Sequence, residues 1–275
     1  MGNRYTGKTF IGEILAILLG LVFLVPFYYL LSNSLKPFAE ILTNTSALPK
    51  AFMLDNYVNA FEKLNYLKVF INSVFITAIS NVVLVVFCSM AAYMLVRTKK
   101  KISNVIFMTF VAAMIIPFQS IMIPLIKTAG NFGLLNSIWG LVIMYLGFGS
   151  GMTIFLYHGF IKGIPVELEE AAIIDGCTRF GVFWRIVFPL LKPITVTIVI
   201  LNSLWIWNDY LLPSLVLQDP ELKTIPLATF SFFGQYTKQW DLALAGLVLG
   251  IIPLLIFFFS MQRHIIKGIT SGSIK

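Results

Sequence analysis

A phosphate-binding pattern is present in the first residues of the chain. Gly2, Gly7, Lys8 and Thr9 have the spacing of a loop whose backbone N–H groups surround a phosphate while its lysine contacts the phosphate oxygens. Such a loop works only between a strand and a helix of a parallel sheet. No strand is predicted before it, and a long apolar segment follows. We therefore interpret Lys8 as a charge at a membrane surface and expect ATP to be bound by another chain.

Residues suited to acid–base or metal chemistry are scarce. The chain has two His, 12 Asp and Glu in total, and two Cys whose positions, 88 and 177, fit no metal-ligand spacing. Glu13, His158 and Asp209 are the ionisable residues at the ends of apolar segments, and no series of acids crosses any segment. We expect no enzyme, no metal and no cofactor. A multi-pass membrane enzyme or an ion-coupled carrier remains the alternative from another class.

The composition predicts a membrane protein. Hydrophobic residues make up 58% of the 275 residues and charged residues only 12%, about half the share that covers the surface of a soluble protein. The missing charge indicates that lipid, and not water, surrounds the chain. The net charge of +8 is spread between apolar runs and forms no basic stripe, so no nucleic-acid partner is expected.

Six apolar segments are long enough to cross about 30 Å of hydrocarbon as helices. Their backbone polar groups must pair within each segment, so the predicted fold is an all-α integral membrane protein. Pro26, Pro117, Pro124 and Pro253 interrupt spans and predict kinks. The candidate spans are Ile14–Leu31, Asn72–Leu95, Asn104–Leu125, Ile138–Phe160, Ile194–Leu212 and Leu242–Ser260.

The basic residues predict the orientation. With six spans and an inner N-terminus, the inner side carries thirteen of the 20 Lys and Arg residues, including every Arg. This imbalance follows the excess of Lys and Arg in cytoplasmic segments, so we expect both termini to be cytoplasmic. On that side, residues 161–193 form a connection much longer than a helix–helix turn needs, and long loops of this kind are usually functional.

The loop at 161–193 contains signals for two short helices. Pro165 and the carboxylates after it favour a helix start, and Gly176 favours a helix end. A second helix is predicted from about Arg179 to Phe188, ending at Pro189. The two alanines after Glu170 keep one surface of the first helix narrow, which suits insertion into a cleft on another protein.

The same residues resemble a known motif. Glu170-Ala171-Ala172, then Gly176, Ile186 and Phe188-Pro189 have the spacing of the EAA loop of ABC importer permeases, although Phe188 stands where that family usually has Leu. In that family the loop forms a coupling helix that docks into a groove of the ATP-binding subunit. The resemblance therefore implies a docking role for five residues: Glu170, Ala171, Ala172, Asp175 and Gly176.

Further segments resemble the maltose-permease-like, sugar-importing branch of that family, among them Ser34–Pro37, Trp207–Asp209 and Gly268–Gly272. The resemblance implies a type I importer permease in a bacterial inner membrane, with residues 1–275 as one domain, a core at about 68–262, and a di- or oligosaccharide as substrate. Implied partners are a second homologous permease, two copies of an ATP-binding subunit and an extracytoplasmic sugar-binding protein. A permease for a non-sugar solute is the alternative within the family.

Uncharged polar residues inside the spans could line a sugar path. Helix–helix hydrogen bonding is an equally good interpretation for each of them. The candidates are Asn81, Gln119, Asn202 and Asn208.

Overall fold

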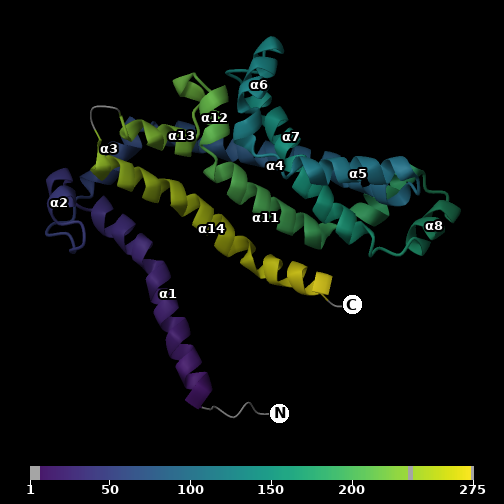
Figure 1. Cartoon of the computed structure of the whole chain (residues 1–275), viewed down its shortest axis with the longest axis horizontal. Helices are drawn as coiled ribbons and strands as arrows, with labels where there is room; N and C mark the ends of the chain where they lie inside the picture. The colour runs from purple at the N-terminus through teal and green to yellow at the C-terminus, as the bar shows by residue number, and fades with distance from the viewer. Residues whose placement is uncertain (1–6, 235–237, 274–275) are drawn as a thin grey trace. The chain divides into compact units, whose positions relative to one another are not determined.

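The protein is mostly helical. A computed structural model describes residues 7–234 and 238–273, which form helices and one isolated bridge between Phe233 and Lys238 (Figure 1). The chain divides into two compact units, Met1–Tyr66 with Thr229–Ile252, and Leu67–Ala228 with Pro253–Lys275. Residues 2–6 of the phosphate-binding pattern lie outside the described residues.

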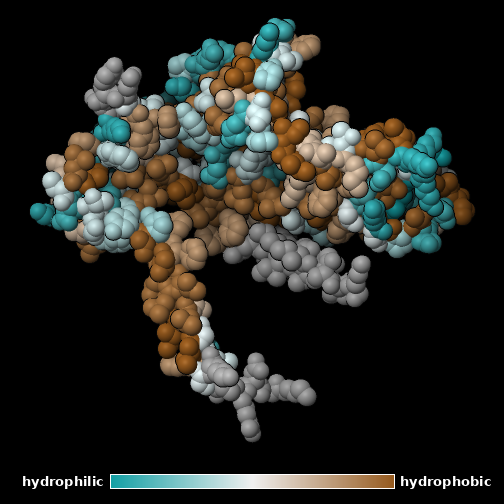
Figure 2. Space-filling model, in the orientation of Figure 1, coloured by the Kyte–Doolittle hydropathy of each residue, from teal (hydrophilic) through white to brown (hydrophobic). Residues whose placement is uncertain are grey.

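The first unit begins with a long apolar helix, α1 (Gly7–Ser34), of 28 residues. At 1.5 Å per residue it is about 42 Å long, enough to cross a bilayer. None of its most apolar 18-residue window is buried inside the protein, and hydrophobic residues cover it in Figure 2. A helix that is apolar on every face needs an apolar solvent, so α1 has the character of a membrane-spanning helix.

The rest of the first unit is folded around a buried lysine. Its short helices are α2 (Phe38–Thr43), α3 (Asp55–Lys63) and η3 (Phe230–Phe232), followed by the start of α14 (Trp240–Ser273). Lys36 is 0% exposed, and its Nζ donates to Asn33 Oδ1 at 2.9 Å and to the carbonyls of Asn44 and Thr45 at 3.1 and 3.2 Å. The residues between the first two predicted spans are therefore structured.

The second unit is a bundle around α7 (Ile138–Ile161), which contacts α5, α11 and α12. A Cβ added to Gly151 of α7 would lie 2.7 Å from Met114 Cγ and 3.0 Å from the Phe110 carbonyl oxygen, so glycine permits this close approach. The other helices are α4 (Tyr66–Arg97), α5 (Lys101–Ala113), α6 (Phe118–Asn131), α11 (Lys192–Asn208), α12 (Leu211–Val216), η2 (Pro220–Leu222), α13 (Ile225–Thr229) and the remainder of α14.

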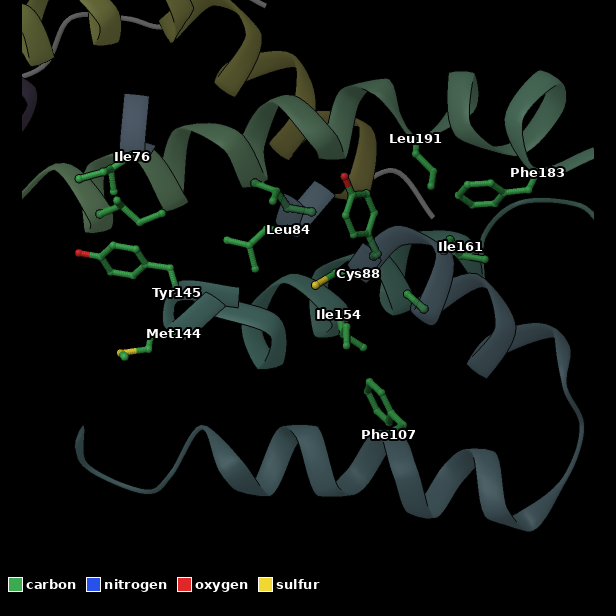
Figure 3. Close-up of a cluster of buried hydrophobic side chains, with 14 of the residues drawn as sticks. Ile76, Leu84, Cys88, Phe107, Met144, Tyr145, Ile154, Ile161, Phe183 and Leu191 are labelled. Atoms are coloured by element: carbon green, nitrogen blue, oxygen red, sulfur yellow. The ribbon is translucent and has the colours of Figure 1, made fainter. Parts of the chain in front are cut away.

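A continuous apolar core joins these helices. Leu84 of α4, Phe107 of α5 and Ile154 of α7 belong to one cluster of buried side chains, seen together in Figure 3. The cluster continues through Phe183 and Leu191, which lie in the connection between α7 and α11. The connection between α7 and α11 is thus packed onto the helical bundle.

Among the described residues, four helices are long and apolar enough to span a membrane, and six spans result if each of two bent pairs counts as one. Four predicted spans correspond to α1, α4, α7 and α14. The fifth, predicted to continue to Leu212, ends as a helix at Asn208, and α12 starts at Leu211. The number six and the inward termini stay predictions.

The predicted span Asn104–Leu125 is broken before α6, where Pro117 predicted a kink. It is divided into α5 and α6, whose axes differ by 105°. Pro117 has an extended conformation at the start of α6, because a proline and the residue before it disfavour a continuous helix. By contrast, Pro26, Pro124 and Pro253 lie inside helices.

We expect Lys36→Met to loosen the segment that Lys36 holds. The substitution removes the donor of three hydrogen bonds, one of them to the buried Asn33, at a cost of about 1–3 kcal/mol. Hydrogen exchange should therefore accelerate at the amides of residues 37–54. The exposed Lys50, replaced in the same way, is the control. Equal exchange in the two variants would contradict the role of Lys36.

Candidate functional site

The loop at 161–193 contains the predicted acidic helix. It is α8 (Glu167–Ile174), and Glu167, Glu169 and Glu170 all lie in its first turn. Carboxylates there interact favourably with the unpaired N–H groups and the positive end of the helix dipole. Within the second unit, hydrophilic residues gather around α8 in Figure 2. The helix start predicted from Pro165 is confirmed.

Gly176 ends α8 as predicted. Its φ of +89° lies in the left-handed region, which favours glycine. The N–H groups of Gly176 and Cys177 donate to the carbonyls of Ile173 and Ala172 at 3.0 and 2.9 Å. This pair of bonds is the Schellman arrangement, which satisfies carbonyls that the end of a helix leaves free.

Four of the five predicted docking residues form an exposed face, namely Glu170, Ala171, Asp175 and Gly176. Ile174 lies beside them and is 85% exposed. Ala172 is different, because it is only 8% exposed and belongs to the apolar core. Its small side chain lets α8 pack closely on the bundle, and the docking role that the resemblance gave to Ala172 stays a prediction.

Glu169 anchors the opposite face of α8. Its Oε1 accepts from Arg97 Nε at 2.8 Å and lies 2.7 Å from Arg97 Nη2, while Oε2 accepts from the Tyr93 hydroxyl at 2.7 Å. Arg97 Nη2 also donates to the Ile164 carbonyl at 3.0 Å. The Arg97 and Glu169 side chains are 18% and 7% exposed. The C-terminal end of α4 thus holds both α8 and the residues before it.

The sequence did not predict these contacts of Glu169 with Arg97 and Tyr93, which we call the anchor. The signal that could have revealed it is helical spacing, since Glu169 lies three residues before Ala172 and shares its face, whereas Glu170 does not. An arginine directly after the long apolar run of α4 is the second signal. Neither signal says which element the buried carboxylate meets.

The predicted second helix differs in form. The segment is α9 (Arg179–Val182), a π-turn η1 (Phe183–Val187) and α10 (Phe188–Leu190). Pro189 lies in the first turn of α10, and the helical segment ends at Leu190, within one residue of the predicted end. The axis turns by 73° before α11. π-turns are frequent at functional sites.

Aromatic rings connect the π-turn to the anchor. Phe183 packs on Tyr93 with ring centroids 5.3 Å apart, and on Trp184 at 5.0 Å. Trp184 in turn packs on Phe188 at 4.9 Å. Tyr93 therefore contacts η1 through its ring and α8 through its hydroxyl.

The four polar residues that could line a sugar path do not lie at one site in the structure. Asn81 lines a cavity of about 550 Å³ between α4, α11 and α14, together with Thr77, Ser203 and Trp207. The other three lie elsewhere. Gln119 is exposed on α6, Asn202 donates to Thr153 Oγ1 at 3.3 Å, and the exposed Asn208 donates to the Leu204 carbonyl at 2.7 Å.

Asn81 has an unusual hydrogen-bond pattern. Its Nδ2 donates to the Thr77 carbonyl at 2.9 Å and to Ser203 Oγ at 3.1 Å. Its Oδ1 is buried and has no partner. Buried polar atoms are almost always hydrogen-bonded, so this oxygen is an exception beside the cavity.

The family model "Binding-protein-dependent transport system inner membrane component" matches residues 85–271. The "Probable starch degradation products transport system permease protein AmyC" of Thermoanaerobacterium thermosulfurigenes is 51% identical over 95% of both chains. The "Multiple sugar-binding transport system permease protein MsmG" of Streptococcus mutans is 36% identical over 93% of both. The "Melibiose/raffinose/stachyose import permease protein MelC" of Bacillus subtilis is 35% identical over 95% of both.

A solved structure shares the fold. It is a chain of a bacterial ABC transporter involved in the import of the acidic polysaccharide alginate, and it superposes with a TM-score of 0.78. The match covers 95% of this chain and 99% of that chain at 23% identity.

We expect Gly176→Ala to fray the end of α8. A side chain in the left-handed conformation costs roughly 1–2 kcal/mol, and the two terminal hydrogen bonds depend on that conformation. Hydrogen exchange at the Gly176 and Cys177 positions should accelerate. Gly163→Ala is the matched control, because Gly163 lies in the same loop without a positive φ. Unchanged protection at both amides would show that glycine is not required there.

Proposed function

Because the chain belongs to the family of binding-protein-dependent transport system inner membrane components, we propose that it is the permease subunit of an ATP-driven importer of sugars. The observation that carries this proposal is α8, an acidic helix with an exposed face, held on the bundle at the position of the family's coupling loop. The subunit performs no chemistry, and ATP hydrolysis belongs to a separate subunit.

The substrate class rests on the named relatives. Starch degradation products, multiple sugars, and melibiose, raffinose and stachyose are named for chains that match this one over more than nine-tenths of its length. We infer a di- or oligosaccharide. These names favour a sugar over another solute as the substrate. They also favour an importer permease over an ion-coupled carrier or a membrane enzyme.

The exposed face of α8 is proposed to dock into a groove of the ATP-binding subunit. Glu170 and Asp175 supply negative charge, and Ile174 supplies an apolar side chain that is 85% exposed. A complementary groove would have basic residues around an apolar floor. Closure of two ATP-binding subunits would displace α8, and ligands at separate sites would thereby bias two states of the transporter.

The assembly we propose contains this chain, a second homologous permease, two ATP-binding subunits and an extracytoplasmic sugar-binding protein. The chain lies in a bacterial cytoplasmic membrane with both termini inside, which the distribution of Lys and Arg supports. Residues 1–275 act as one permease domain with a core at about 68–262, and residues 161–193 form its contact with the ATP-binding subunit.

Glu170→Lys tests the docking surface. Charge reversal on the exposed face should lower sugar uptake and binding-protein-stimulated ATPase activity at least tenfold, while insertion into the membrane stays normal. Glu62→Lys, on an exposed position of α3, is the control and should change neither quantity. The measurements are ATPase assays and co-purification of the ATP-binding subunit in mild detergent. If Glu170→Lys has the same binding-protein-stimulated ATPase activity as wild type, this docking surface is refuted.

We also propose that the cavity at Asn81 is part of the sugar path. The unpaired Asn81 Oδ1 can accept from a hydroxyl group, and Trp207 adds an aromatic ring to the same lining. The side chains lining this cavity are uncharged, which suits a neutral sugar.

Asn81→Leu should therefore lower the rate of sugar uptake about tenfold without releasing the ATP-binding subunit. The leucine is similar in size but cannot accept a hydrogen bond. Asn208→Leu serves as the matched control, since Asn208 is exposed and bonds only within its own helix in the described contacts. Uptake of labelled oligosaccharides into proteoliposomes is the measurement. Equal rates for the two variants would exclude Asn81 from the path.

A further inference from the structure

We propose that Arg97 and Glu169 are positioning residues that make α8 and the inner end of α4 move as one body. This inference rests on the proposed function, in which a partner displaces α8. In this inference, a displacement of α8 is transmitted to α4 through the Arg97–Glu169 ion pair.

The first support is the geometry of the pair. One carboxylate receives Arg97 Nε and Nη2 on one oxygen and the Tyr93 hydroxyl on the other, at 2.7–2.8 Å. Arg97 also holds the Ile164 carbonyl. These contacts fix α8 in position and orientation, because several directed bonds converge from two side chains of α4.

The second support is burial. The two side chains are 18% and 7% exposed, so the pair is poorly screened by water or salt. Separating the two would leave a charge in an apolar surrounding, which is strongly unfavourable. A displacement of α8 is therefore more easily accommodated by moving the end of α4 than by breaking the pair.

The third support is the arrangement of α8 itself. Glu169 faces the bundle, whereas its neighbour Glu170 lies on the exposed face. The docking surface and the anchor thus occupy opposite sides of one short helix. A push on one side reaches the other without an intervening flexible segment.

The fourth support is where α4 leads. Arg97 is the last residue of α4, and Asn81 lies sixteen residues earlier in the same helix. At 1.5 Å per residue this is about 24 Å along the axis. A movement of the inner end of α4 is therefore carried to the cavity that Asn81 lines. Tyr93 adds a second branch, through Phe183, to the π-turn before α11.

The test uses the complete importer with its ATP-binding and sugar-binding partners in lipid nanodiscs. The variants are Arg97→Glu, Glu169→Arg and the double exchange, with Lys99→Glu as a charge-matched control on an exposed position. We expect the ATP-binding subunit to remain bound in all of them. Binding-protein-stimulated ATPase activity should fall at least tenfold in each single variant and recover to within threefold of wild type in the double exchange.

Two results would overturn the inference. One is a binding-protein-stimulated ATPase activity equal to that of wild type in both single variants. The other is loss of the ATP-binding subunit from the single variants, which would show that the pair only holds the docking surface in shape. If Glu170→Lys uncouples the importer and the anchor variants do not, this inference alone fails. If the purified wild-type importer contains no ATP-binding subunit, the proposed function fails as well.

A spectroscopic measurement covers the case in which charge reversal prevents folding. Spin labels at Ile173 and Lys99, with Cys177 replaced by Ser, report the separation of α8 from the end of α4. The wild-type distance should be the same in the resting and ATP-trapped states. In Arg97→Gln it should differ by several ångströms between them. A wild-type distance that changes between the two states would overturn the inference.

Discussion

A carboxylate held almost out of water is the constraint on which the position of α8 depends. Glu169 is 5% exposed, and its partners Arg97 and Tyr93 reach it only when α8 lies on the end of α4. Removing one member of a buried pair costs about 3–5 kcal/mol, whereas an exposed pair contributes about 0–1 kcal/mol. The Lys68–Glu221 pair, 3.4 Å apart and largely exposed, belongs to the second class. Breaking the Arg97–Glu169 pair therefore costs more free energy than breaking the Lys68–Glu221 pair.

Lys36, the buried lysine of the first unit, is also removed from water, but different groups compensate for its lost hydration. Lys36 is surrounded by neutral oxygens, one from Asn33 and two from backbone carbonyls. Three short bonds fully use the donors of its ammonium group. The arrangement orders the residues that follow α1, but it can be formed by any nearby carbonyls. The Glu169 anchor is more selective, because it requires one particular side chain of another helix.

Much of the fold follows from the sequence because lipid leaves the backbone few choices. Apolar stretches must be helices, and Gly176 has a conformation that favours glycine. The acidic helix and its exposed face were predictable for the same local reasons. The π-turn at Phe183–Val187 was not, because it depends on how the segment packs against its neighbours. The sequence predicted a kink at Pro117 but not the angle of 105° between α5 and α6. The partner of Glu169 lies 72 residues away in the sequence, and no local pattern indicates such a distance.

The two alanines of the acidic helix show how one short motif serves two surfaces. Ala171 is exposed next to Glu170, so its small size leaves a narrow outer face. Ala172 is buried and shares a side of the helix with Glu169, so its small size allows α8 to approach the bundle until Arg97 reaches the carboxylate. A larger residue at 171 would widen the face that we propose for docking, whereas a larger residue at 172 would lift the helix from Arg97. The two small residues thus serve opposite faces, and the contact made through Ala172 is internal to this chain.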